Sequence, residues 1–155
     1  MSNKGKSKIS KSDFKQMILD DYRLVSEVRE SGAQGRRDVL SGKGTFGIFG
    51  DGKEIAQIAL AKVFRKGDFR AGYYRDQALM SALGQYSPKH MFSALYGDPD
   101  LSREPSSGSR QMMNHFGTRF LNDDGSWRNL MEQNNSTSDM ACLASQFPRL
   151  VGLAQ

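Results

Sequence analysis

Apolar residues recur at steps of three and four along several segments of the chain, and this period predicts a mostly helical structure. The first such segment lies between Ser12, a favourable residue for the start of a helix, and Gly32, which ends the pattern. We therefore expect a first helix between these two residues. Its apolar stripe consists of Phe14, Met17, Ile18, Tyr22, Val25 and Val28.

A second helix is predicted after the sequence Gly50-Asp51-Gly52-Lys53-Glu54. Asp51 is expected to cap this helix, with Glu54 reaching back to the cap in a variant of the capping box. Gly67, which follows a cluster of basic residues, marks its end. The face expected to be buried consists of Ile55, Ile58, Ala59 and Val63.

The rest of the chain alternates short predicted elements with turns. Residues 69–74 have strand character, residues 76–83 predict a helix closed by Gly84, and Ser87-Pro88 opens a helix that Gly97 closes. Residues 98–109 predict a long surface loop, and residues 122–125 predict a turn. An apolar segment with helical spacing runs from residue 140 to the end of the chain.

Length and composition are those of one folded domain. The chain has 155 residues, of which 37% are hydrophobic and 25% are charged. A chain of this length can bury about two-thirds of its surface, which is enough for a core of its own. No apolar run approaches the roughly 18 residues needed to cross a bilayer, so no membrane partner is expected.

The net charge of +5 is concentrated at the N-terminus, where residues 1–12 contain four lysines and no acidic residue. This segment lacks the apolar stretch of a secretory signal and predicts a disordered basic tail. Because the remainder is nearly neutral, the charge does not predict a nucleic-acid partner. Cys142 is the sole cysteine, which excludes an internal disulfide and a cysteine-cluster metal site and indicates a cytoplasmic protein.

Two clusters have residue types suited to binding an anion. Tyr73-Tyr74-Arg75-Asp76 lies where a predicted strand meets a predicted helix, and an arginine fork beside a tyrosine hydroxyl suits a phosphate or carboxylate. The alternative to anion binding is that Arg75 forms an ordinary surface ion pair with Asp76. The second cluster consists of residues 107–112 and His115. The alternative interpretation of this cluster is a loop without a ligand that returns to the core at Met112, Met113 and Phe116.

The order of five motifs identifies a family resemblance over residues 40–155. These motifs are GIFGDGKE, KGDF with GYYRDQ, FSALYGD, SGSRQMMNHFG and SQFPRLVGLAQ. In this order they resemble the N-terminal region of the thiamine-diphosphate-dependent decarboxylating component of 2-oxo acid dehydrogenase complexes, as an α subunit or as a fused α/β chain.

The resemblance implies an α/β thiamine-diphosphate-binding fold in the parent protein. Residues 13–155 would be the N-terminal part of that domain, truncated at the C-terminus, mostly α with one or two short strands. Apolar faces on the second and last helices are then expected to lack the strands that cover them in the parent.

The resemblance also implies roles for single residues. Tyr74 and Arg75 match the pair that binds the cofactor diphosphate. Residues 140–146 match a stretch that meets the aminopyrimidine side of the cofactor and a potassium ion. Ala141 and Cys142 depart from the usual Ser and Pro, which leaves backbone contacts at Ala141 and Leu143. Ser145 and Gln146 are the residues expected to bind the potassium ion. His115 is the residue expected near the reacting centre.

The implied activity is oxidative decarboxylation of a branched-chain 2-oxo acid or pyruvate on thiamine diphosphate, with transfer of the acyl group to a lipoyl carrier. The implied partners are a β subunit or β half, a lipoyl acyltransferase and further copies in an oligomer. The Mg²⁺ ligands are expected outside this chain, because no asparagine follows Gly50-Asp51-Gly52 at the family spacing. The chain alone is therefore expected to be inactive, and a non-catalytic subunit-association module derived from the family is the alternative.

Overall fold

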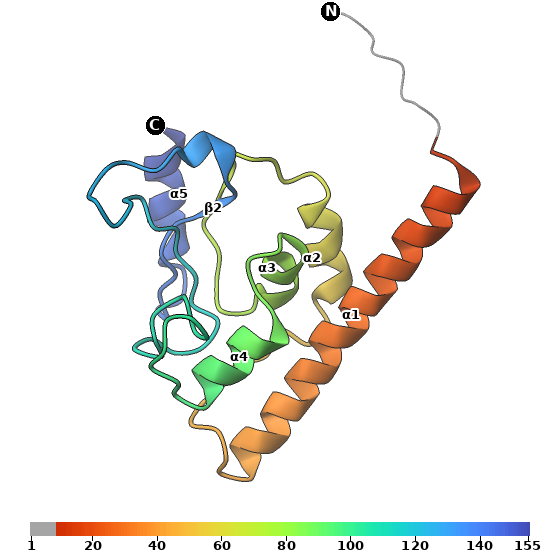
Figure 1. Ribbon diagram of the computed structural model, residues 1–155, viewed down its shortest axis with the longest axis horizontal. Coiled ribbons are helices and arrows are strands. Elements are labelled where there is room, and N and C mark those ends of the chain that lie inside the picture. Colours follow the sequence, from red (N-terminus) through yellow and green to blue (C-terminus); the bar gives the residue numbers. More distant parts are fainter. Residues whose placement is uncertain (1–8) are drawn as a thin grey trace, which may run out of the picture.

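The computed structural model describes residues 9–155, and within them the chain is mostly helical (Figure 1). The helices are α1 (Lys11–Leu40), α2 (Glu54–Ala61), α3 (Gln77–Ala82), α4 (Pro88–Leu95), the 3-10 helix η1 (Leu130–Glu132) and α5 (Gln146–Ala154). The two strands, β1 (Phe69–Arg70) and β2 (Asn135–Ser136), form one small parallel sheet. This confirms the prediction of a mostly α chain with one or two short strands.

The first helix is longer than its sequence pattern predicted. Ser10, not Ser12, caps it by accepting a hydrogen bond from the Asp13 amide at 3.1 Å. The helix continues through Gly32 to Leu40, so the expected end at Gly32 is wrong. Residues 1–8 of the expected basic tail lie outside the described residues, and residues 11 and 12 already belong to α1.

A glycine in α1 allows close packing instead of ending the helix. A Cβ atom on Gly35 would lie only 2.5 Å from a ring carbon of Phe49, so the absent side chain makes room for this ring. Glycine is tolerated in a helix interior at a cost of about 1 kcal/mol, and packing can offset that cost. The long red-to-orange helix of Figure 1 therefore passes directly beside the segment that follows it.

The predicted capping box at the start of α2 is wrong, because its two acids bind α1 instead. Lys53 occupies the N-cap position with no side-chain bond. Glu54 accepts two hydrogen bonds from Arg29 of α1, at 2.7 and 2.9 Å, and Asp51 pairs with Arg36 of the same helix. An arginine fork on a buried carboxylate is a stronger interaction than a cap on a short helix. The acids therefore fix α2 against α1.

The face of α2 that was expected to be buried is mostly exposed. Of its apolar residues Ile58 is buried, whereas Ile55 is 74% exposed and Val63 lies beyond the helix, which ends at Ala61. Ile55 and Val63 are thus uncovered and Ile58 is not, while the expectation that strands of a parent protein cover this face stays a prediction.

The two helices in the middle of the chain agree with their predicted signals. Ser87 caps α4 by accepting a hydrogen bond from the His90 amide, and Pro88 follows at the first helical position. Gly84 and Gly97 adopt positive φ angles directly after α3 and α4. The apolar core lies between these helices and the chain that returns to them, and it consists of Met80, Tyr86, Met91, Leu95, Met113 and Phe116.

The small sheet joins two segments that lie far apart in the sequence. Phe69 pairs with Asn135 and Arg70 with Ser136. The strand expected over residues 69–74 is thus limited to its first two residues. Its partner is polar, so hydrophobic alternation gave no sign of it.

The C-terminal third is dominated by turns. The predicted turn at residues 122–125 closes with a hydrogen bond from the Gly125 amide to the Asn122 carbonyl, and Leu121 bridges Trp127 across it. The last helix begins at Gln146 and not near residue 140, because residues 141–145 form bends and turns. Leu143 is 80% exposed. No helix in residues 9–155 is long and apolar enough to cross a membrane.

Candidate functional site

The turn of residues 73–76 connects β1 to α3 and is held by a carboxylate. Asp76 accepts hydrogen bonds from the Tyr73 amide and from Arg70 Nε, both at 3.0 Å. Its side chain is therefore not available to cap α3. Gln57 of α2 caps this helix instead, accepting from the amides of Ala78 and Leu79 at 3.1 and 3.2 Å. The turn is fixed at both ends.

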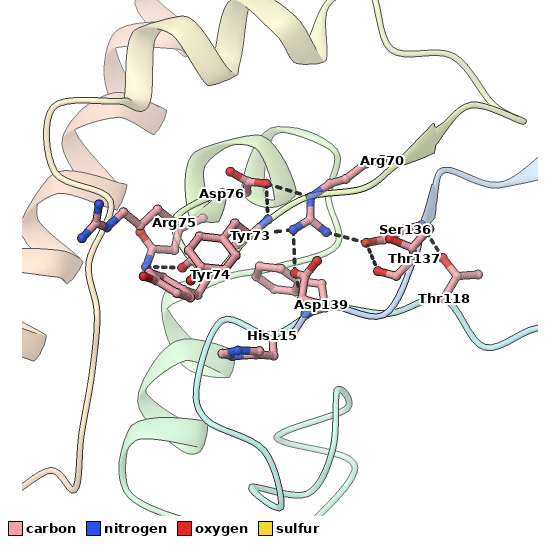
Figure 2. A network of polar contacts seen from close by, with 12 residues as sticks. Arg70, Tyr73, Tyr74, Arg75, Asp76, His115, Thr118, Ser136, Thr137 and Asp139 are labelled. Atoms are coloured by element: carbon pink, nitrogen blue, oxygen red, sulfur yellow. Dashed lines mark hydrogen bonds and ion pairs between the residues drawn. The ribbon is translucent and has the colours of Figure 1, made fainter. Parts of the chain in front are cut away.

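Arg70 is the centre of a buried polar network (Figure 2). Its side chain is 4% exposed, and Nη2 donates to Asp139 Oδ2 at 2.6 Å and to the Tyr73 carbonyl at 3.3 Å. Nη1 donates to the Ser136 hydroxyl. Its Cζ atom also lies 5.3 Å from the ring centre of Phe116, a cation–π contact. One guanidinium thus joins three separate segments of the chain.

Asp139 completes this network from the segment after β2. Its side chain is fully buried, and Oδ2 also accepts a hydrogen bond from the Phe116 amide at 3.0 Å. Burial raises the pKa of this carboxyl, and the charge of Arg70 opposes the rise. Its second oxygen, Oδ1, is buried without a partner among the described residues. Breaking such a buried pair costs far more than breaking a surface pair.

Tyr74 and Arg75 lie on the outer side of this network. Tyr74 is buried, with its ring 3.7 Å from that of Tyr73 between centres, and the Arg75 Cζ lies 5.6 Å from the Tyr74 ring centre. Burial and the Tyr74 hydroxyl raise the pKa of Tyr73 to about 12, so the hydroxyl of Tyr73 is neutral at pH 7. The Arg75 carbonyl accepts a hydrogen bond from Gln57 at 2.8 Å, which fixes its backbone.

The Arg75 guanidinium is suited to an external anion. It is exposed, and the ion pairs within residues 9–155 do not include it. Asp76 pairs with Arg70 and not with Arg75, so the alternative of an ordinary Arg75–Asp76 surface pair is wrong. A cationic fork beside a tyrosine fits a diphosphate.

A hydrogen bond brings the two segments expected at the cofactor into contact. The Tyr73 hydroxyl donates to the Ala141 carbonyl at 2.7 Å, across 68 positions of sequence. Ala141 is therefore held against Tyr73, the residue before Tyr74 and Arg75, whereas Leu143 projects into solvent. Both residues stay predictions as cofactor contacts.

Ser145 and Gln146 begin α5, directly after Ala144, which adopts a positive φ of 65°. The Gln146 Oε1 atom is buried and has no hydrogen-bond partner among the described residues. An unpartnered amide oxygen is of the ligand type that a hard cation prefers, and Ser145 precedes it in the sequence. Residues 9–155 contain no group of three or more His, Cys, Asp or Glu side chains arranged to hold a metal ion.

His115 is buried on the other side of Tyr74, with ring centres 6.0 Å apart. Its Nδ1 atom lies 2.9 Å from the Met112 carbonyl, so Nδ1 carries the proton. In the neutral ring, Nε2 is then the acceptor. The structure thus places His115 near Tyr74, while its expected catalytic role stays a prediction.

Sequence reasoning missed the residues that organise the site, Arg70 and Asp139, and the buried Glu104 in the loop beside it. No local pattern marks an arginine on a two-residue strand as buried. Gly72 is the one usable signal, because a Cβ there would lie 2.1 Å from the Arg70 Nε atom.

Comparison with known proteins gives one distant relative. The chain is 31% identical over 140 residues to the protein named 2-oxoisovalerate dehydrogenase subunit alpha from Bacillus subtilis (strain 168). The match covers 90% of this chain and 37% of the relative, so the chain spans little more than a third of the length of that protein. No protein-family model and no solved structure match. The relative supports the resemblance to 2-oxo acid dehydrogenase components.

Proposed function

We propose that the chain is the N-terminal part of the thiamine-diphosphate-dependent decarboxylating component of a 2-oxo acid dehydrogenase, acting on a branched-chain 2-oxo acid or pyruvate. The observation that carries this proposal is the hydrogen bond from Tyr73 to the Ala141 carbonyl. It brings together the anion-binding turn and the segment expected at the aminopyrimidine, which the sequence alone could not place in contact.

Each segment has a separate binding task. Tyr74 and Arg75 donate to the cofactor diphosphate, and the backbone at Ala141 and Leu143 meets its aminopyrimidine side. The bound cofactor supplies the electron sink for loss of carbon dioxide from the 2-oxo acid. The Mg²⁺ ligands belong to other parts of the parent protein, as does the partner β subunit or β half.

Two further residues complete the proposed site. Ser145 and Gln146 hold a K⁺ ion through their side-chain oxygens, which fixes the start of α5. His115 presents Nε2 as a hydrogen-bond acceptor toward the reacting end of the cofactor. A lipoyl acyltransferase would be the partner that accepts the acyl group from the cofactor in the whole protein.

Ligand titration of the purified chain tests the proposed binding turn. We expect thiamine diphosphate with Mg²⁺ to shift the backbone amide signals of Tyr74, Arg75 and residues 141–146 in ¹⁵N-resolved NMR spectra. Arg75→Gln should weaken binding by about ten- to a hundredfold, because it removes a charge-assisted pair of donors worth about 1.5–3 kcal/mol. Arg65→Gln, at another exposed arginine, is the matched control and should bind as the wild type does.

Absence of shifts at Tyr74 and Arg75 at millimolar thiamine diphosphate would contradict the proposed turn. Turnover is a separate readout. The chain mixed with thiamine diphosphate, Mg²⁺, a 2-oxo acid and an artificial electron acceptor should give no product, and clear product formation would refute the division of the catalytic groups between this chain and other parts of the parent.

An uncovered apolar groove favours the second candidate, a subunit-association module without catalysis. A cavity of about 350 Å³ lies between α1 and α2 and is lined mainly by apolar side chains, among them Ile18, Val25 and Ile55. Large apolar patches of this kind mark contact surfaces. A thermal shift with a β-type partner but none with thiamine diphosphate would favour this candidate.

A further inference from the structure

A second cavity, of about 430 Å³, borders the buried polar network through Ser136 and Phe116, both of which contact Arg70. Four segments build it: the end of α3 with Gln85, the loop of residues 101–106, the chain around residues 116–119 with Arg128, and residues 133–136. None of the residues proposed to bind thiamine diphosphate lines it. It is therefore a separate site.

The charge of this cavity is entirely positive. Arg119 and Arg128 both line it, and no acidic residue does. Neither arginine takes part in the ion pairs formed within residues 9–155. The two acids of the neighbouring turn, Asp123 and Asp124, lie outside the lining.

One of the two arginines, Arg128, is held by hydrogen bonds to the chain. Arg128 Nε donates to the Leu121 carbonyl at 3.1 Å, and the Arg128 amide donates to the Phe120 carbonyl at 2.8 Å. No described residue accepts from its Nη atoms. A guanidinium anchored at Nε presents two parallel N–H groups, the arrangement that matches the two oxygens of a phosphate or carboxylate.

The cavity lining also offers hydroxyl and apolar groups. The Thr118 hydroxyl accepts from the Ser136 amide at 2.7 Å, which fixes the wall and leaves its proton to donate. Met80, Leu101 and Phe116 supply an apolar surface beside it. The volume is that of a small-molecule site, and convergent donors on an apolar wall are typical of one.

We infer that this cavity binds a small oxyanion, a phosphate or carboxylate that carries an apolar group, with Arg119 and Arg128 as its cationic ligands. The apolar group of the ligand packs against Phe116 and Leu101. The site is independent of the proposed cofactor turn, so either can exist without the other.

The test uses the whole chain with two probes, phenyl phosphate and benzoate, each titrated by calorimetry at low salt. Binding of either probe that weakens at least tenfold in Arg128→Gln, and in Arg119→Gln, supports the inference. Tighter binding of phenyl phosphate identifies a phosphate ester as the ligand class, and tighter binding of benzoate identifies a carboxylate. Arg65→Gln, at an exposed arginine that lies outside the cavity lining, is the control and should leave the affinity of both probes unchanged.

Two results would overturn the inference: no binding of either probe at millimolar concentration, or binding that both arginine variants retain. Arg128→Lys provides a second readout that does not depend on loss of folding. It keeps the charge and removes the fork, so an intermediate affinity is expected, and an affinity equal to that of the wild type would contradict recognition by the fork.

Discussion

The replacement Glu104→Gln tests the most densely hydrogen-bonded carboxylate in the loop of residues 98–109. Glu104 is 2% exposed although it lies in a loop. Its Oε1 accepts from the Ser106 amide at 3.1 Å, and its Oε2 accepts from the amides of Ser107 and Ser109 at 2.8 and 2.9 Å and from the Ser107 hydroxyl at 3.1 Å. The loop is folded around this one side chain.

The cost of Glu104→Gln follows from the number of donors. Glutamine has a single oxygen, so in either orientation its amide NH₂ faces at least one backbone N–H. A buried donor without a partner costs about 1–3 kcal/mol, and the remaining bonds lose their charge assistance. We expect a loss of about 2–4 kcal/mol, out of roughly 5–15 kcal/mol for a domain. This corresponds to a melting temperature lower by roughly 5–12 °C.

The pH dependence of this loss has a definite sign. Burial alone would raise the pKa of Glu104, but hydrogen bonds from Ser109, Ser107 and Ser106 outweigh it and lower the pKa below the ordinary 4.5. A lowered folded pKa means that the ionised group contributes its full stability above about pH 4.5. This contribution is lost as the pH falls through the folded pKa. The difference between wild type and variant should therefore be largest at pH 7 and shrink in acid.

Urea unfolding of both proteins at pH 7 and at pH 3–4, followed by circular dichroism, measures this difference. Glu132→Gln is the control, because Glu132 is exposed and accepts no side-chain hydrogen bond within residues 9–155. A Glu104→Gln variant as stable as the wild type at pH 7, or a deficit that is unchanged in acid, would refute the role assigned to this carboxylate.

Two further predictions concern glycines. Gly35→Ala should destabilise the protein by about 1–3 kcal/mol in urea unfolding, because its Cβ would overlap the Phe49 ring. Gly152→Ala is the matched control in α5, where a Cβ meets nothing within 4 Å, and it should stabilise by up to about 1 kcal/mol. Gly72→Ala would place a Cβ on the Arg70 guanidinium, so we expect weaker thiamine diphosphate binding together with lower stability; unchanged values in both assays would contradict the network.

Local signals predicted those elements that are defined by their own residues. The Ser87-Pro88 start of α4, the glycines after α3 and α4, and the turn at residues 122–125 all depend on capping and turn chemistry within a few positions. The same signals failed where a distant partner competes. Asp51 and Glu54 have the pattern of a capping box, but the arginines of α1 bind them instead.

In the candidate site, too, the features set by neighbouring residues could be predicted and those set by distant residues could not. The turn that carries Tyr74 and Arg75 could be identified from its residue types and its place between a strand and a helix. The groups that hold the turn could not be identified, because Arg70 and Asp139 are 69 positions apart and each is common on protein surfaces. Which distant charged residues form a pair is decided by the fold, and the spacing of apolar residues within one segment does not predict it.

The two segments of the proposed cofactor site, the turn with Tyr74 and Arg75 and the segment that begins at Ala141, differ in rigidity and in exposure. The turn with Tyr74 and Arg75 rests on a buried ion pair and on Gln57, so it is formed before any ligand arrives. The segment after Ala141 has one anchoring bond, to Tyr73, and Leu143 is exposed. Preformed donors bind without an ordering cost, whereas an exposed segment must be ordered on binding. In this chain the diphosphate end of the cofactor should therefore supply most of the affinity, and inorganic pyrophosphate with Mg²⁺ should bind within about tenfold of thiamine diphosphate. A much larger advantage for thiamine diphosphate would show that residues 141–146 are already organised for the aminopyrimidine.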